Sequence, residues 1–408
     1  MSEGALKAGD DDATLAGVVV IEHGKGVAAS YAGRVLALMG ATVIKIECPT
    51  GDALRREQPL LRDAADSGVL FNYLNINKSS VTLDITGEEG ARLLGQMLAR
   101  ADILIDDTLP AERPAFHLDP ATICARHPRL IYASVLPFGA TGPHAAYRAY
   151  ELNVFHSGGE GYLMPNGLAL EMFPDRPPVK IYGHFAELVG GLSAASGIMA
   201  ALLVQDESGG QFVDISEQDA NVAISCFNVQ RVGDGVVEYR AGRSFRYGGV
   251  LECADGYVQV LTLEPRQWAG LVKLMGEPAW IQDPALQEEI ERGRRGPEIN
   301  RHLREWARPR KVAELVTGGQ ALGVPIAKYA EPAEVINSAQ SKARHIFTPL
   351  DIEGLGEVPV LTAPYQLTLP PQVRAYPAKA GADNQKILCE WLGHAGSELE
   401  RWTRAQVV

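Results

Sequence analysis

Short hydrophobic runs alternate with helix-spaced apolar residues over the first third of the chain. The predicted strands cover residues 17–22, 42–47, 80–84, 102–105 and 130–134, and the predicted helices cover residues 28–39, 87–100 and 120–127. Because a helical crossover connects parallel strands, this alternation predicts an open α/β sheet over residues 17–135, with strands buried on both faces.

The pattern changes beyond this sheet. Residues 136–182 are rich in Gly, Pro and Tyr and predict ordered loops, where functional sites tend to lie. A long helix with many small residues is predicted over 185–205. Residues 245–262 are typical of a β-hairpin and residues 266–320 of charged helices, so 240–330 is predicted as a second, smaller domain.

Composition and charge narrow the class of protein. The chain has 408 residues, 46% of them hydrophobic, which suits two or three domains with a large core. With 38 Lys and Arg against 50 Asp and Glu, the net charge of -12 disfavours a nucleic-acid partner but allows one local basic pocket. The five cysteines lack CxxC spacing, and residues 1–16 form a polar lead-in without signal-peptide character. With no run of ~18 apolar residues, the sequence predicts a cytoplasmic protein without a membrane segment.

A glycine-containing turn follows the first predicted strand. Residues 24–29 match GxGxxA, and Glu47 ends the next predicted strand 18 residues after the turn, as in a dinucleotide site. A tight strand-to-helix turn favours glycine without any ligand, so both interpretations stay open. Lys45 lies inside a buried strand, and we expect it to be ion-paired, with Glu47 as a candidate partner.

Other polar residues allow a functional and a structural interpretation. Arg55, Arg56 and the segment 75–79 suit phosphate or base recognition, or simply a solvated turn. Glu187 begins the small-residue helix, where the macrodipole stabilises an anion; it is a candidate nucleophile or general base, or only a favourable first-turn residue. The histidines lack metal-ligand spacing and no GxSxG is present, so we expect neither a metal site nor an α/β-hydrolase.

Several ordered segments resemble one enzyme family. Residues 37–56 (ALMGATVIKIECPTGDALRR) resemble LGADVIKVE...GD..RR, and residues 71–85 (FNYLNINKSSVTLDI) resemble NRNKRSVTLDL. Likewise, residues 101–110, 127–143 and 209–220 resemble ADVVVENFRP, NPRLIYCSISGFGQTGP and GQRVDVSLLDA. Over nearly its whole length the chain is similar to family III CoA-transferases, also called the CaiB/BaiF family, which includes formyl-CoA transferase and alpha-methylacyl-CoA racemase.

The resemblance implies a fold and an assembly. It implies a Rossmann-like open sheet in a large domain built from both termini, a smaller central α+β domain, and an interlocked homodimer. The expected parts are a lead-in over 1–16, the large domain over 17–225, the small domain over 240–330 and a return segment over 335–408. The large domain would bind coenzyme A as a substrate, so residues 24–29 become a structural turn and no NAD is expected.

The resemblance also implies a reaction. Glu187 falls at the family's nucleophilic aspartate, which attacks an acyl-CoA thioester to give a mixed anhydride and then an enzyme-bound CoA thioester. CoA then passes to a small carboxylic acid. The alternatives are an acyl-CoA isomerase, racemase or lyase with Glu187 as general base, and a CoA-binding protein without transferase activity. Tyr150 occupies the position of the racemase histidine, which disfavours racemisation.

The resemblance implies a set of contact residues. The expected coenzyme A contacts are Val27, Ala28, Arg55, Leu74, Asn75, Asn77, Lys78, Asp107, Phe138 and Gly139, and the expected substrate pocket contains Tyr150, His156 and His184. Asp107 and Leu109 depart from the family's Asn and Arg. The segment 156–174 is longer than expected and is predicted to shape the acyl pocket.

Overall fold

The computed structural model describes residues 12–408 except 64, 166–172, 226–232, 234, 236–246 and 353–355. Most of the predicted lead-in, the middle of segment 156–174 and the start of the predicted hairpin therefore lie outside the described residues. The chain divides into two compact units, which are taken in turn: one of residues 1–161, 180–229 and 340–408, the other of residues 162–179 and 230–339.

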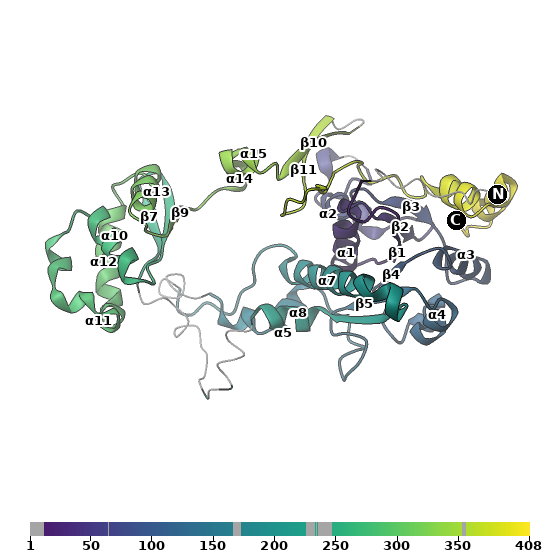
Figure 1. Ribbon diagram of the computed structural model, residues 1–408, viewed down its shortest axis with the longest axis horizontal. Coiled ribbons are helices and arrows are strands. Elements are labelled where there is room, and N and C mark those ends of the chain that lie inside the picture. Colours follow the sequence, from purple (N-terminus) through teal and green to yellow (C-terminus); the bar gives the residue numbers. More distant parts are fainter. Residues whose placement is uncertain are drawn as a thin grey trace. The chain divides into compact units, whose positions relative to one another are not determined.

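A six-stranded parallel sheet forms the first unit (Figure 1). Its strands are β1 (Val19–His23), β2 (Thr42–Glu47), β3 (Ser79–Thr82), β4 (Ile103–Asp106), β5 (Ile131–Leu136) and β6 (Phe212–Ser216). Their order is β3-β2-β1-β4-β5-β6, so the direction of winding reverses between β1 and β4. The predicted parallel sheet is confirmed, but β6 was missed, because its five residues lack a continuous apolar run.

Helices cover both faces of this sheet. They are α1 (Val27–Leu38), α2 (Val69–Leu74), α3 (Glu88–Leu98), α4 (Pro120–Arg126), α5 (Glu151–Ser157), α7 (Phe185–Ser208), α8 (Glu217–Ile224) and α16 (Gly396–Arg404), with a π-helical turn over Gln385–Trp391. Successive strand residues enter opposite apolar clusters: Val20 packs with α1 and α7, whereas Ile21 packs with α3 and α16. This alternation explains why the strands read as continuous apolar runs.

The C-terminal segment completes the first unit. The Asn77 side chain accepts backbone N–H groups of Arg374 and Ala375 at 2.7 and 3.0 Å. Asp383 accepts the Ser80 N–H at 2.8 Å, so the segment after residue 370 runs beside β3. Before this segment in the sequence lie the antiparallel β10 (Phe347–Ile352) and β11 (Gly356–Leu361), in which Phe347 pairs with Leu361.

The second unit has its own core. An antiparallel sheet of β7 (Gly249–Cys253), β8 (Gly256–Val260) and β9 (Ile326–Lys328) packs with α10 (Pro265–Leu274), α11 (Glu289–Arg294), α12 (Gly296–Ala307) and α13 (Val312–Ala321). After them come α14 (Pro332–Asn337) and α15 (Ala339–Ala343). From residue 340 on, the chain belongs to the first unit. The predicted hairpin turns at Ala254-Asp255, where the Asp255 carboxylate accepts the Val312 N–H at 2.7 Å.

Helix α7 approaches its neighbours closely through glycines. A Cβ added at Gly191 would lie 2.5 Å from the carbonyl oxygen of Ala28 on α1, and one at Gly190 would lie 2.6 Å from Cγ of Glu217 on α8. Its length and apolar composition would let α7 span a membrane. In this fold it is a core helix, because its small residues pack against α1 and the sheet.

The α1–α7 contact yields a stability prediction. Gly191→Ala places a methyl group against backbone that cannot move aside, so we expect a loss of about 2 kcal/mol or more in the free energy of unfolding. Gly95→Ala, inside α3 with nothing within 4 Å of its added Cβ, is the matched control and should gain ~0.5–1 kcal/mol. Urea unfolding measures both, and equal stabilities of the two variants would contradict the close approach.

Candidate functional site

A cavity of about 290 Å³ lies at the carboxyl edge of the large sheet. Its lining comes from the segments after β1, β4 and β5 and from the first turns of α7 and α8. The predicted residues Val27, Ala28, Asp107, Tyr150 and Glu187 all line it. The cavity therefore lies where parallel strands reverse their winding, the usual ligand position in open α/β sheets.

Glu187 is buried in the first turn of α7, with 9% of its surface exposed. His184 Nδ1 lies 2.6 Å from Glu187 Oε2, and the Glu187 backbone N–H donates to Glu151 Oε2 at 3.1 Å. Burial raises the pKa of the Glu187 carboxyl and Glu151 adds to this, whereas the His184 hydrogen bond opposes it. Burial thus disfavours the charged form of this carboxyl group, and the contact with His184 favours it.

Glu151 holds the segment that leads into α7. It lies on α5, and its Oε1 is 3.3 Å from Lys180 Nζ. Lys180 also donates to the carbonyl oxygens of Ile181 and Gly183 at 2.7 and 2.5 Å. One lysine and one carboxylate therefore fix the approach of the chain to Glu187.

Asp107 closes the cavity from the side of β4. Its Oδ2 accepts the backbone N–H groups of Lys25 and Gly26 at 2.8 and 2.5 Å. Burial raises the pKa of the Asp107 carboxyl, although the Gly26 N–H counteracts this effect. Asp107 thus ties the end of β4 to the turn before α1. This turn belongs to residues 24–29, for which the sequence allowed either a ligand-binding or a purely structural role.

A second cavity, of about 400 Å³, shares Lys25 and Phe116 with the first and extends past Cys48 and Thr86. The Lys25 ammonium lies over the Phe116 ring, 5.0 Å from its centroid. Lys25 is exposed and stands where the two cavities meet. The two cavities are therefore neighbours that share a cation in their linings.

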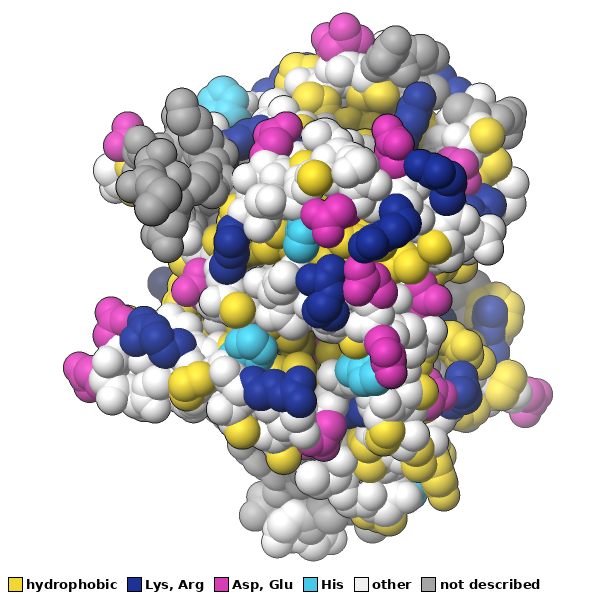
Figure 2. Space-filling model, turned by 90° about the vertical axis from the view of Figure 1, so that its right-hand side faces the viewer, with side chains coloured by type: hydrophobic (Ala, Val, Ile, Leu, Met, Phe, Trp, Pro, Cys, Tyr) yellow, Lys and Arg dark blue, Asp and Glu magenta, His cyan; other side chains and the backbone are white. Residues whose placement is uncertain are grey.

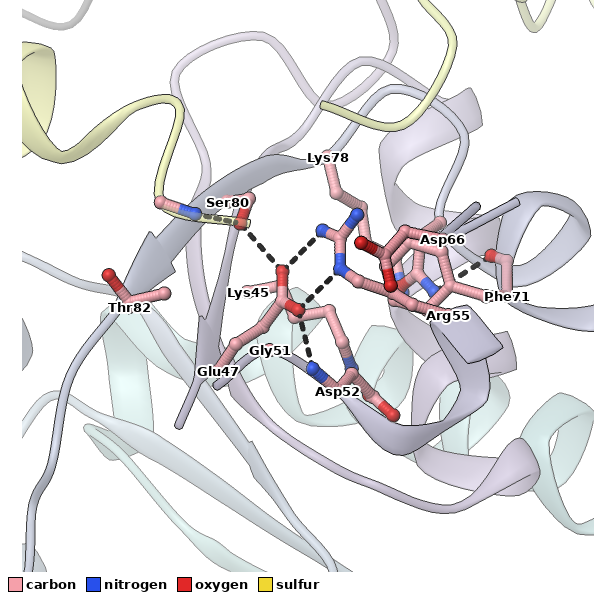
Figure 3. A network of polar contacts seen from close by, with 12 residues as sticks. Lys45, Glu47, Gly51, Asp52, Arg55, Asp66, Phe71, Lys78, Ser80 and Thr82 are labelled. Carbon is pink, nitrogen blue, oxygen red and sulfur yellow. Dashed lines mark hydrogen bonds and ion pairs between the residues drawn. The ribbon is translucent and has the colours of Figure 1, made fainter. Parts of the chain in front are cut away.

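Arg55 lies in a buried polar network outside the Glu187 cavity (Figure 3). Its guanidinium binds the Glu47 carboxylate through two hydrogen bonds of 2.7 and 2.6 Å and lies over the Phe71 ring. Ser80 Oγ and the Asp52 N–H also donate to Glu47. Burial alone would raise the pKa of Glu47, but the hydrogen bonds from Arg55 and Ser80 hold it below its usual value.

Lys45 and Lys78 are buried beside this network. Lys45 is ion-paired as expected, but with Glu22 at 3.2 Å and Asp52 at 3.1 Å; Glu47, the suggested partner, is engaged by Arg55. Lys78 Nζ contacts Glu22 at 2.7 Å and donates to Ser30 O at 2.8 Å. Burial lowers the pKa of Lys78 to about 8 despite the attraction of Glu22.

The remaining expected contacts lie apart from the Glu187 cavity. Leu74 is fully buried, and Asn75 Oδ1 accepts from Lys78 at 2.9 Å. Asn77 holds the C-terminal segment. Phe138 packs with His144 and Tyr147. Gly139 lies near Asp214 and His156 lies near Gly161, and neither is among the residues that line the cavity. Their roles in ligand binding stay predictions.

The charged surface differs from this interior. On the face drawn in Figure 2, basic and acidic side chains of the described residues are intermingled, with histidines among them. The buried cations of the first unit, in contrast, each have an acidic or backbone partner. Lys25 is an exposed cation that lines both cavities, whereas the exposed Arg148 lines only the first of them and the exposed Arg56 only the second.

The structure adds three residues that the sequence did not single out. Glu151 directly follows Tyr150, Glu217 lies within the quoted segment 209–220, and Lys25 lies inside the glycine turn. Neither of their helices was predicted: α5 lies in residues 136–182, which were expected to be loops, and α8 follows β6, so a first-turn acid was an unused signal for both glutamates. Only the packing of α5, α7 and α8 shows that they meet at Glu187.

The first unit is an open α/β sheet, and a cavity lined by buried carboxyl groups lies at the carboxyl edge of its strands. This is where proteins with such sheets bind their ligands. The model of CoA-transferase family III matches residues 15–384, and the chain belongs to this family. The resemblance seen in the sequence is confirmed.

The chain is similar to characterised relatives over most of its length. It is 27% identical to a formyl-CoA:oxalate CoA-transferase of Streptomyces avermitilis, over 94% of this chain and 97% of the relative. It is also 27% identical to a succinate–glutarate CoA-transferase of Agrobacterium fabrum, over 92% and 95%. A CaiB/BaiF family protein from Brucella suis has a similar structure, with a TM-score of 0.81, 26% identity and coverage of 93% and 99%.

The Arg55–Glu47 pair can be tested against a phosphate-binding role. Arg55→Met leaves a buried carboxylate without its partner, so we expect a loss of about 3–5 kcal/mol in unfolding free energy. The low pKa of Glu47 stabilises the fold above its usual value of 4.5, and this contribution is lost as the pH falls through the folded pKa. The deficit of the variant, measured by urea unfolding, should therefore shrink in acid.

Arg56→Met is the control for this variant, because the Arg56 side chain is 52% exposed and its contact with Asp66 is 3.6 Å long. We expect its stability to change by less than ~0.5 kcal/mol. A phosphate-binding Arg55 would give the opposite result, in which Arg55→Met stays as stable as the control while its affinity for coenzyme A falls.

Proposed function

We propose that this CoA-transferase moves CoA from an acyl-CoA to a small carboxylic acid, with Glu187 as the nucleophile. The observation that carries the proposal is the position of Glu187. The residue is buried, is hydrogen-bonded to His184 and lines the cavity that shares Lys25 and Phe116 with the second cavity. A carboxylate in the first turn of a 24-residue helix is favoured by the macrodipole, while burial removes its water shell. Both effects suit a nucleophile that must attack a carbonyl carbon.

The reaction has two half-reactions. A Glu187 oxygen attacks the thioester carbonyl, the C–S bond breaks, and an acyl-glutamyl anhydride and CoA thiolate form. The thiolate then attacks the glutamyl carbonyl, which releases the donor carboxylate and leaves a glutamyl-CoA thioester. The acceptor carboxylate repeats these steps in reverse and leaves as acyl-CoA, so no proton or electron is consumed.

The two cavities suggest how coenzyme A lies in this chain. The smaller cavity contains Glu187 and suits the thioester, whereas the cavity past Cys48 and Thr86 suits the nucleotide. Lys25 stands between them and is placed to bind a phosphate. In this arrangement, Arg55 and Lys78 act by holding β2 and β3 in place.

The two CoA-transferases to which the chain was compared above are named for small acyl groups. Their names specify formyl-CoA with oxalate, and succinate with glutarate. The cavity of about 290 Å³ must also accommodate the thioester end of coenzyme A, which favours a small acyl group here. The homodimer expected from the resemblance is proposed on the same basis; one relative is named as the beta subunit of a CoA-transferase.

A covalent intermediate at Glu187 tests the proposed function. After incubation with succinyl-CoA or formyl-CoA, hydroxylamine should convert the activated Glu187 to a hydroxamate that peptide mass spectrometry detects. Glu187→Gln should abolish both the label and turnover. Glu187→Asp keeps the carboxylate but withdraws it by on the order of 1 Å, so we expect the label to persist with ~100-fold slower turnover.

Glu207→Gln, on the exposed end of the same helix, is the control and should keep wild-type labelling. Turnover without any label on Glu187 would overturn the covalent mechanism. If deuterium from solvent entered the acyl group without an acceptor, Glu187 would instead act as a general base.

The role of Lys25 gives a separate binding prediction. Lys25→Ala removes the cation between the cavities, so we expect the Kd for coenzyme A, measured by calorimetry at low salt, to rise about tenfold, which corresponds to ~1.4 kcal/mol. The difference should narrow as salt screens the phosphate. Lys273→Ala, an exposed lysine of the second unit, is the matched control. Equal affinities of the two variants would remove Lys25 from the binding site.

A further inference from the structure

Glu217 is a second buried carboxyl group in the Glu187 cavity. It is the first residue of α8, where Ser216 caps the helix by accepting the Asp219 N–H. Its Cγ faces Gly190, which lies three residues after Glu187 and thus on the same side of α7. The family segment GQRVDVSLLDA has Leu at the position of Glu217. An acid is therefore not needed for packing at this position.

The helix that carries Glu217 is firmly fixed. Asn221 Nδ2 donates to the carbonyl oxygens of Ala186 at 3.0 Å and of Glu217 at 2.8 Å. Asn221 is 4% exposed, and an added Cβ at Gly158 of the neighbouring segment would lie 2.8 Å from its Cβ. Glu217 therefore cannot turn out to solvent without breaking the contact between α7 and α8.

The Glu217 carboxyl is incompletely satisfied within the protein. Only 6% of the residue is exposed, and among the described residues its Oε2 has no hydrogen-bond partner. A buried polar atom without a partner costs ~1–3 kcal/mol. Because Glu217 lines the cavity, a ligand that enters it meets this residue.

The groups that face Glu217 are mostly acidic. Glu187 approaches from α7, Glu151 from α5 and Asp107 from the end of β4. Two nearby basic side chains are engaged elsewhere: Lys180 with Glu151, and His184 with Glu187. Asp219 on α8 is exposed, and Asp214 of β6 accepts the Ala140 N–H. Burial, and then repulsion from Glu187, raises the pKa of Glu217 well above 4.5.

We propose that Glu217 is a protonated carboxylic acid that donates a hydrogen bond to the carboxylate of the acceptor as it meets Glu187. The inference rests on the proposed function and identifies the group that receives the acceptor. Lys25 and Arg148 also line the cavity, but next to Glu217 an entering anion meets the carboxyl groups of Glu187, Glu151 and Asp107, so a neutral carboxyl group that donates a hydrogen bond favours its approach. The same bond holds the donor carboxylate when it forms, so one acid serves both half-reactions.

The proposal predicts opposite requirements for the two glutamates. Glu187 must be ionised to attack, so turnover falls at low pH; Glu217 must be protonated to donate, so acceptor affinity falls at high pH. Together they produce a bell-shaped profile, in which the two limbs belong to a coupled pair. Removing the titration of Glu217 should abolish only the alkaline limb.

Three variants of the full-length enzyme separate the possibilities, with succinyl-CoA as donor and glutarate or oxalate as acceptor. Glu217→Gln retains an N–H donor at every pH, so the KM for the acceptor should stay near the wild-type value and lose its alkaline rise. Glu217→Leu has no donor and should raise this KM about tenfold or more, while kcat changes less. Asp219→Asn, in the same first turn but exposed, is the control and should match the wild type.

Protonation of Glu217 is measured independently of turnover. The infrared spectrum should contain a protonated-carboxyl band that is present in the wild type, shifted in D₂O and absent from Glu217→Gln. Because the folded pKa is raised, the stability of the wild type should fall relative to Glu217→Gln as the pH rises from the usual carboxyl pKa through the folded one.

These measurements distinguish the inference from the proposed function. A missing Glu187 label contradicts the nucleophile, whatever Glu217 does. A normal label together with the same acceptor KM in the wild type and Glu217→Leu overturns the role of Glu217. The absence of the infrared band at neutral pH, or an alkaline limb that survives in Glu217→Gln, overturns its protonation.

Discussion

The position of α7 against α1 and α8 is the constraint on which the site depends. Gly190 and Gly191 leave no side chain between these helices, so the backbone of α7 reaches Ala28 on one side and the stem of Glu217 on the other. Larger residues would push α7 outward and carry Glu187 away from the turn after β1. Packing, more than any direct contact with the sheet, therefore sets the distance between the nucleophile and the bound coenzyme A that we propose.

The buried charged groups of the first unit occur in two kinds of arrangement. Around β2 and β3, each buried cation has a carboxylate or carbonyl partner, and Arg55 binds both oxygens of Glu47 through the Nε–Nη2 edge of its guanidinium group. At the end of β4 and the starts of α7 and α8, buried carboxyl groups crowd together and their pKa values rise. Paired charges stabilise a fold, whereas crowded, buried carboxyl groups have raised pKa values, which are typical of functional sites.

The sequence predicted the parts whose cause is local. Runs of β-branched residues marked five strands, and the position of Glu187 before a small-residue helix marked the first turn of α7. It did not reveal that Arg55 and Lys78 are engaged by Glu47 and Glu22, because those partners lie in other strands or turns. Strand β6 was missed for a related reason: four of its five residues are not fully buried, and its pairing with β5 is what makes it a strand.

The acids of the cavity bear on why glutamate can stand where the family has aspartate. Glu187 has one more methylene than aspartate, and its longer side chain must end near the same carbonyl carbon. In this chain His184 binds its Oε2 and the α7–α8 contact encloses it, so the carboxyl group is held from two sides. Glu217, in place of an apolar residue, adds a carboxyl group to the wall opposite Gly190. The longer carboxylate at 187 and the additional acid at 217 thus line one cavity, in which, as we propose, a protonated Glu217 binds the acceptor carboxylate.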